Sequence, residues 1–503
     1  MKNSNNTIQV FWVALGSISS IGLSIVSAAI LSRYFNKADY GTYKQIVYVY
    51  STLLVIFSAG LPTVFSYFLP RFNLQQGKEI VLKVSKFLFF TGFLFSLFLY
   101  LSSGYISQIL KNPALSIGLK AFSPIPMLLL PTLGIGGVFA TYKKTAYIPI
   151  YESVTRIITL IFILFPVIVL HKSYIYAIYG WNIAAVLSLI IAIYFKNIPF
   201  IHVKAEKVNL SFKEIFAYSL PLLTASLWGT AIKAADQFYV SRYFGSEIFA
   251  EYSNGFIEIP FVAMITTSVS TVLLPVFSKM FYKGSDSDDF VTIWKSALNK
   301  SAMIIYPMVI FFIFNASDIV TIMYSSRYSN STIYFQIAML INFFNIVIFA
   351  PLLLSMGKTK FYSNLHMFIA ICAWGLGYVV VLIFKSPVAI AILSVSLSVL
   401  KVLIAFLFVS KLIKISIGKL LPKQIVYYIL HSVAVIVLVR FILSEIHLQP
   451  KPLINLSISL ACYIVVLLVT SFPLKLNYLS VIQPFVIDFI RKKPDSSENA
   501  INK

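Results

Sequence analysis

The sequence predicts an all-α, polytopic membrane protein with about fourteen transmembrane helices. Of its 503 residues, 59% are apolar and only 11% are charged, whereas soluble domains carry roughly 25% charged residues. The apolar residues also fall into long blocks, and a block of about 20 such residues crosses a bilayer as a helix. Because the blocks are continuous rather than alternating, they indicate a helical bundle and not a β-barrel.

The predicted spans follow one another closely along the chain. They cover residues 8–32, 43–69, 80–102, 115–140, 146–170, 173–195, 215–241, 250–277, 297–316, 330–356, 361–384, 388–410, 424–444 and 453–471. The first block is too long for a signal peptide, so we expect a retained helix. The fourth span contains Pro124, Pro126 and Pro131 and must kink.

The basic residues predict the orientation. Most of the 40 lysines and arginines lie in the N-terminus, the loops after even-numbered spans and the C-terminal tail. This excess predicts that both termini are cytoplasmic. The net charge of +23 then reflects topology and contact with anionic membrane lipids, and no basic block is large enough to indicate a nucleic-acid-binding domain. The stretches 411–423 and 481–490 have the pattern of interfacial amphipathic segments.

Two segments of the chain repeat each other. Residues 31–45 and 240–254 share five residues at one constant offset, and each segment joins an outward helix to the next. The matched residues are Ser32, Arg33, Tyr34, Phe35 and Tyr43 in the first copy, and Ser241, Arg242, Tyr243, Phe244 and Tyr252 in the second. Chance is the alternative, because aromatic and basic residues are common at membrane interfaces. The shared topological place favours two parallel six-helix repeats.

This repeat predicts the organisation of the chain. The parts are a six-helix half at 1–195, a cytoplasmic linker at 196–214, a second half at 215–410, two further helices with an interfacial segment at 411–474, and a cytoplasmic amphipathic tail at 475–503.

The halves resemble those of the Wzx-type oligosaccharide-lipid flippases. The resemblance rests on the turn from Arg33 to Tyr43, on its copy from Arg242 to Tyr252, and on the stretch Tyr218–Leu223, and it covers roughly residues 8–475. These flippases share a superfamily with the multidrug-and-toxin extruders (MATE) and the lipid II flippases. The resemblance implies a MATE-like fold and a flippase for an undecaprenyl-diphosphate-linked oligosaccharide in a bacterial inner membrane. It also implies a glycan polymerase as a candidate partner.

Charged residues inside the spans are the candidate site, because such charges are costly in a membrane. Lys233 and Asp236 share one helical face, as do Glu152 and Arg156. Each pair is interpreted either as an internal ion pair or as a substrate site. In the second reading, Lys233 and Arg156 bind the diphosphate and the carboxylates hold these cations or exchange a proton. Glu258 is a further candidate for coupling to a proton or sodium ion, and the alternative is that it pairs with Lys233 or Arg242.

The repeat adds three candidate substrate contacts. Arg33 and Arg242 lie at the outer rim, where the alternative is interface anchoring or helix-end pairing with Asp39 and Glu251. Tyr43 is a candidate for stacking on a sugar, with packing as the alternative.

No enzyme is predicted. The sequence contains no phosphate-binding glycine loop, and its five histidines and two cysteines lack metal-ligand spacing, so we expect no catalytic residues, metal or cofactor. The alternatives to a flippase are a multidrug cation antiporter of the same superfamily and a membrane polysaccharide polymerase. Short external loops disfavour the polymerase, and basic candidates such as Lys233 disfavour the antiporter.

Overall fold

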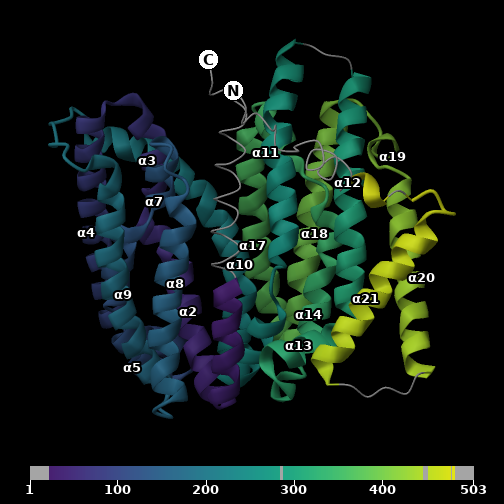
Figure 1. The fold of residues 1–503 in the computed structure, drawn as a ribbon, viewed down its shortest axis with the longest axis horizontal. Coiled ribbons are helices and arrows are strands. Elements are labelled where there is room, and N and C mark those ends of the chain that lie inside the picture. Colours follow the sequence, from purple (N-terminus) through teal and green to yellow (C-terminus); the bar gives the residue numbers. More distant parts are fainter. Residues whose placement is uncertain (1–21, 284–286, 446–450, 477, 482–503) are drawn as a thin grey trace, which may run out of the picture. The chain divides into compact units, whose positions relative to one another are not determined.

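A computed structural model describes residues 22–283, 287–445, 451–476 and 478–481, and each regular element in these ranges is a helix (Figure 1). The chain forms two compact units. The first unit contains the described parts of 1–257, 320–337 and 363–398, and the second contains those of 258–319, 338–362 and 399–503. This division differs from the two six-helix halves, which stay a prediction.

The first 257 residues contain the longest helices. In chain order they form an unlabelled helix, Gly22–Tyr34, followed by α2 (Lys37–Ser58), α3 (Pro62–Phe68), η1 (Leu69–Arg71), α4 (Leu74–Ile109), α5 (Pro113–Phe122), α6 (Ile125–Leu129), η2 (Leu130–Thr132), α7 (Ile135–Thr141), α8 (Tyr147–Ile168), α9 (Tyr174–Asn197), η3 (Ile198–Phe200) and α10 (Phe212–Gly255).

The rest of the chain is also helical. It forms α11 (Pro260–Lys283), α12 (Ser287–Phe314), α13 (Ala316–Tyr324), η4 (Ser326–Tyr328), α14 (Ser331–Leu340), α15 (Asn342–Asn345), α16 (Phe349–Ser355), α17 (Thr359–Phe384), α18 (Pro387–Leu412), α19 (Ile417–Leu420), α20 (Gln424–Glu445), α21 (Pro452–Ser471) and η5 (Tyr478–Val481).

The helix starts follow from capping residues. Asn36 accepts a hydrogen bond from the Asp39 amide at 2.8 Å, and Asn73 accepts one from the Gln76 amide at 2.8 Å. Ser211 caps α10 in the same way, through the Glu214 amide at 3.2 Å. Each cap satisfies one of the amides that the first helical turn leaves unpaired.

Breaks inside the spans occur where the backbone turns left-handed. Gly60 separates α2 from α3 with φ 68°, and Gly134 begins α7 with φ 78°. The predicted kink in the fourth span is confirmed, because its three prolines coincide with the short elements α6 and η2. Gly245, with φ 84°, lies within α10 and separates the two parts of that long helix.

The spans agree with the prediction by length and composition. Among the described residues, twelve helices are long and apolar enough to cross a membrane, or up to 13 when the bent pair Ser331–Asn345 and Phe349–Ser355 counts as one span. The first predicted span is described only from Gly22, where it is helical to Tyr34. The predicted amphipathic helix at 481–490 lies outside the described residues, except for its first residue at the end of η5.

Apolar side chains cover the outside of the helices. On α4, for example, Phe90 is 52% exposed and Leu101 is 71% exposed, and on α21 Val469 is 63% exposed. Soluble monomers rarely expose apolar surface on this scale. The chain is therefore a multi-span membrane protein whose outer surface faces lipid.

The linker after α9 packs against the first unit. Lys78 donates to the Val203 carbonyl at 2.8 Å, and Lys83 donates to the Leu210 carbonyl at 2.5 Å. Phe200 and Leu210 are buried in the apolar cluster that contains Leu61. These contacts fix the 196–214 segment against the start of α4.

Candidate functional site: a basic cavity in the first unit

The first unit contains a cavity of about 230 Å³, lined by the helix Gly22–Tyr34, α2, α8 and α9. We call it the basic cavity and define it by Tyr40, Tyr43, Lys44, Arg156 and Trp181. It brings together two of the predicted site residues, Tyr43 and Arg156, which lie more than a hundred positions apart in the sequence.

Helical spacing explains how the side chains reach the cavity. Tyr40, Tyr43, Lys44 and Val47 follow the i, i+3, i+4, i+7 pattern, so they form one stripe on α2. Arg156, Thr159, Leu160 and Ile163 repeat the pattern on α8. The helices α8 and α9 pack along each other (Figure 1). Trp181, on α9, also lines the cavity.

The charge of the cavity is positive. Its lining contains Lys44 and Arg156, and none of its described lining residues is acidic. Within the described residues, the Lys44 ammonium makes no hydrogen bond or ion pair, and it lies 5.4 Å from the centroid of the Tyr40 ring. Glu152 interacts electrostatically with Arg156 one turn away but does not line the cavity. This arrangement suits an anionic ligand group.

One wall of the cavity is aromatic. The rings of Tyr43 and Trp181 lie 6.2 Å apart, and Phe122 packs edge-on against Trp181 at 5.2 Å. The Phe35 ring lies 6.4 Å from the Tyr43 ring, so both cavity rings pack against further aromatic side chains. Rigid rings beside a cation can bind an anionic group and an adjoining flat or cyclic group together.

The second candidate group is the carboxylate of Asp236, which is only 7% exposed. It accepts hydrogen bonds from Tyr252 at 2.8 Å, from Ser394 at 3.0 Å and from the Gln237 amide at 2.6 Å. A cavity of about 10 Å³ adjoins it, which is room for about one water-sized group.

Lys233 and Asp236 differ in their surroundings, and their interpretation as an internal ion pair or as a substrate site stays a prediction. The Lys233 side chain is exposed, whereas Asp236 is buried and bonded to hydroxyl and amide donors. A helical face is broad, so a spacing of three residues did not decide which way each side chain turns. Glu258 is exposed in the break between α10 and α11 and belongs to the second unit.

The rim arginines bind helix ends. Arg33 donates to the carbonyls of Ile322, at 2.5 Å, and Met323, at 2.9 Å, near the end of α13. Arg242 donates to the carbonyl of Ile109, the last residue of α4. Their contact with substrate stays a prediction, and helix-end binding is their role in this structure.

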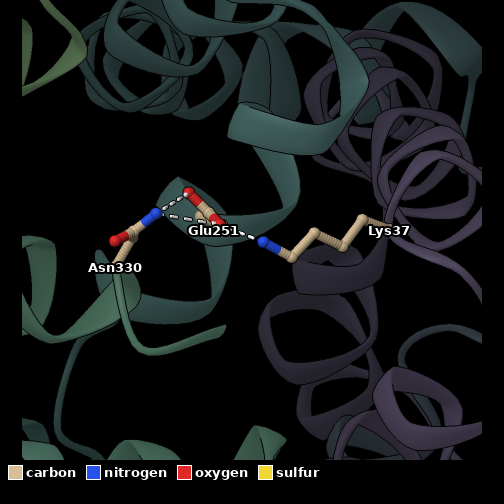
Figure 2. Close-up of polar contacts among 3 residues, drawn as sticks. All are labelled: Lys37, Glu251 and Asn330. Carbon is tan, nitrogen blue, oxygen red and sulfur yellow. Dashed lines mark hydrogen bonds and ion pairs between the residues drawn. The ribbon is translucent and has the colours of Figure 1, made fainter. Parts of the chain in front are cut away.

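An ion pair lies beside these arginines. The Lys37 ammonium is 2.6 Å from a Glu251 oxygen, and Asn330 donates to both oxygens of the same carboxylate at 3.3 and 3.2 Å (Figure 2). Tyr328 lies next to Lys37, 5.8 Å from ammonium to ring centroid. Burial raises the pKa of Tyr328 to about 12, so this phenol stays neutral. We call Arg33, Lys37, Arg242, Glu251, Arg327 and Asn330 the rim network.

The sequence matches one protein family over residues 30–333, more than half of the chain, and that family is described as polysaccharide biosynthesis protein. The chain belongs to this polysaccharide biosynthesis family. No curated protein matches the sequence directly.

Solved structures show the fold of this polysaccharide biosynthesis protein. It is similar to the lipid II flippase MurJ in its inward closed conformation, with a TM-score of 0.69 and 16% identity over 96% of this chain and 100% of that chain. It is also similar to an inward-facing multidrug resistance transporter of the MATE family, in the MOP superfamily. The TM-score is 0.62, with 9% identity over 78% of this chain and 94% of that chain. For a MOP superfamily transporter from Pyrococcus furiosus, the TM-score is 0.56, with 12% identity over 80% of this chain and 94% of that chain. At these identities the likeness establishes the fold.

The sequence analysis of this family member missed Lys44 and Trp181. Lys44 lies at the edge of the second predicted span, where a lysine looks like an interfacial residue. The available signal was its place on one helical stripe with Tyr40 and Tyr43. Trp181 carried no signal, because only folding brings α9 beside α2. In the described part of the chain, no three histidine, cysteine or acidic side chains gather in a way that could hold a metal.

Proposed function

We propose that this protein is a flippase that carries an undecaprenyl-diphosphate-linked oligosaccharide across the bacterial inner membrane. The basic cavity is the observation that carries the proposal, because it presents Lys44 and Arg156 beside two aromatic rings, on helices that are long and apolar enough to cross a membrane. The chain's membership of the polysaccharide biosynthesis family supports a glycan-linked substrate.

In this mechanism the cavity binds the polar head of the lipid. The Arg156 guanidinium binds phosphate oxygens as a fork, and the Lys44 ammonium adds a second positive charge. Tyr43 and Trp181 pack against the first sugar, while the prenyl chain stays in the surrounding lipid. A cavity of about 230 Å³ is below the ~300–1,000 Å³ of typical ligand pockets, so it holds part of the head group at a time.

Transport then requires alternating access. The fold is shared with transporters of the MOP superfamily, and the proposal adds that the cavity faces each side of the membrane in turn. Asp236 is the group that we assign to coupling with a proton or a sodium ion, because its carboxylate is buried beside a space for one small group. Lys233 keeps its predicted role in binding the diphosphate, and Glu152 and Glu258 keep theirs as coupling groups or charge partners.

A drug–cation antiporter is the second candidate, since the fold also occurs in MATE transporters. Such a protein has to bind cationic drugs, which two positive charges without an acidic neighbour in the cavity lining would repel. The charge of the basic cavity therefore favours the flippase.

The first prediction tests the cavity. Lys44→Ala and Arg156→Ala, each as the sole copy in cells, should reduce surface polysaccharide by roughly tenfold, because each removes one charged contact to phosphate. Glycan staining and immunoblotting of the membrane fraction give the two readouts. Lys120→Ala is the matched control, since Lys120 also lies over a tyrosine ring, that of Tyr100 at 5.9 Å, but outside the cavity. Normal polysaccharide in both cavity variants would contradict the assignment.

A further inference from the structure

The two copies of the repeat use their arginines in the same way. Arg33 binds carbonyls near the end of α13, and Arg242 binds the last carbonyl of α4. The last carbonyls of a helix lack partners within the helix and carry partial negative charge. A guanidinium has five donors in a planar fork, which lets Arg33 bind two such carbonyls at once.

The partners of the arginines are equivalent as well. In the predicted repeat, α4 is the third span of the first half, and α13 follows the third span of the second half. Each arginine belongs to the first helix of one predicted half. Arg242 binds the end of the third span of the other half, and Arg33 binds the short helix that directly follows the third span of the other half. The contacts are therefore crossed, as a two-fold relation between the halves requires.

A second cation accompanies each arginine. Arg327 follows α13 and donates to the carbonyls of Ser32, at 3.2 Å, and Arg33 at the end of the helix Gly22–Tyr34. Lys111 follows α4, and its ammonium lies 5.6 Å from the centroid of the Tyr243 ring, next to Arg242. Each repeat segment thus contacts the other predicted half through its own arginine, and it is contacted in turn by one basic side chain of that half.

The same end of the first unit is closed by other contacts between α2 and α10. Gln45 donates to Ser241 at 2.8 Å, and Tyr40 donates to Asn254 at 2.9 Å. The Lys37–Glu251 ion pair joins the same two helices, and Asn330 adds the segment before α14 (Figure 2).

We infer that Arg33 and Arg242 are a pair of equivalent gate residues, which hold this end of the transporter shut by binding helix ends of the opposite half. The inference rests on the proposed transport function, since a gate has a purpose only in a carrier. It gives the repeated Ser-Arg-Tyr-Phe motif a role apart from substrate binding. Both contacts must release in each transport cycle for this end to open.

The test measures the opening of this end without any substrate. Ser32 and Ser241 are repeat equivalents, and both are 0% exposed. In a background where Cys372 and Cys462 are replaced by alanine, Ser32→Cys and Ser241→Cys act as reporters for labelling by a water-soluble maleimide. Purified protein in lipid nanodiscs is accessible from both sides, so the readout does not depend on orientation.

We expect Arg33→Gln to raise the labelling rate at the Ser241→Cys reporter, and Arg242→Gln to raise it at the Ser32→Cys reporter. Each reporter lies in the copy that is not mutated. The expected increase is roughly tenfold, the change that loss of one charged hydrogen bond produces. Arg33→Lys and Arg242→Lys keep a cation and should give a smaller increase.

Arg440→Gln is the matched control. Arg440 also donates to a helix-end carbonyl, that of Phe314 at 2.8 Å, but within the second unit. Labelling that stays unchanged in both glutamine variants of well-folded protein would overturn the inference, and so would an equal increase in Arg440→Gln. If a glutamine variant fails to fold, the lysine variants decide the question in the same assay. Loss of polysaccharide in the Lys44 and Arg156 variants is a separate result, so the gate and the transport function can fail independently.

Discussion

At the scale of single residues, the lining of the basic cavity contains cations but no acidic side chain among its described residues. Lys44 and Arg156 line the basic cavity, whereas Asp236 and Glu251 are each enclosed by hydrogen-bond donors. An unpaired buried charge is costly, so each carboxylate is stabilised by its own donors and not by the cavity cations. Arg156 also interacts electrostatically with Glu152, but Glu152 does not line the cavity, so the charge of the lining itself is positive.

The Lys37–Glu251 pair allows a prediction at this scale. Lys37→Glu or Glu251→Lys alone places like charges side by side and should loosen the rim, whereas the double exchange should restore most of the loss. We expect a coupling free energy of about 1 kcal/mol, because the Lys37 side chain is 31% exposed and partly screened. Thermal unfolding of the purified variants measures it.

The control for this exchange is Glu247→Lys. Glu247 is exposed on the same helix, one turn before Glu251, so reversing its charge should change stability little. An additive double exchange, with no recovery, would show that the pair contributes nothing to the rim.

At the scale of helices, close packing of α2 on α10 depends on a glycine. A Cβ built on Gly41 would lie 1.9 Å from the Ser246 carbonyl oxygen, which is backbone and cannot turn away. Only glycine permits this approach, and the approach lets Lys37, Tyr40 and Gln45 reach their partners on α10.

Gly41→Ala should therefore force α2 away from α10. We expect a destabilisation on the order of 2 kcal/mol, as for overpacking in a core, and faster labelling of the Ser241→Cys reporter. Gly104→Ala is the matched control, because a Cβ there meets no atom within 4 Å and alanine favours the helix. Equal thermal stability of the two variants would contradict this account of the packing.

The sequence predicted helices better than it predicted their partners. Apolar blocks gave the spans, and the prolines gave the kink in the fourth span, because both depend on local chemistry. The break at Gly60 and the left-handed turn at Gly245 were not predicted, since a lone glycine in an apolar run is compatible with an unbroken helix. The partners of Asp236 on α18 and of Arg33 on α13 depend on tertiary contacts that no spacing reveals.

At the scale of the whole molecule, the repeat has diverged in chemistry. Tyr43 and Tyr252 are equivalent in the two copies, yet Tyr43 lines the basic cavity and Tyr252 donates to Asp236. In the proposed function, one copy thus contributes to substrate binding and the other to the carboxylate that we assign to coupling. In a carrier with two such sites, a ligand bound at one site can change whether the other site is open to solvent, provided both sites affect the same gate. Here α2 and α10, which carry the two tyrosines, are the helices that the rim network joins.

Replacement of Asp236 separates coupling from transport. Asp236→Asn retains the size of the side chain and can still accept hydrogen bonds from Tyr252 and Ser394, so the fold should persist. The amide cannot take up a proton or compensate a cation, so transport of a lipid-linked oligosaccharide into proteoliposomes should no longer respond to an imposed pH or sodium gradient. Downhill exchange should continue at a similar rate.

Asp318→Asn is the control, since Asp318 accepts a hydrogen bond from Asn455 at 2.6 Å within the second unit, away from these helices in the chain. Gradient-driven transport that survives Asp236→Asn would assign coupling elsewhere, with Glu258 as the next residue to replace.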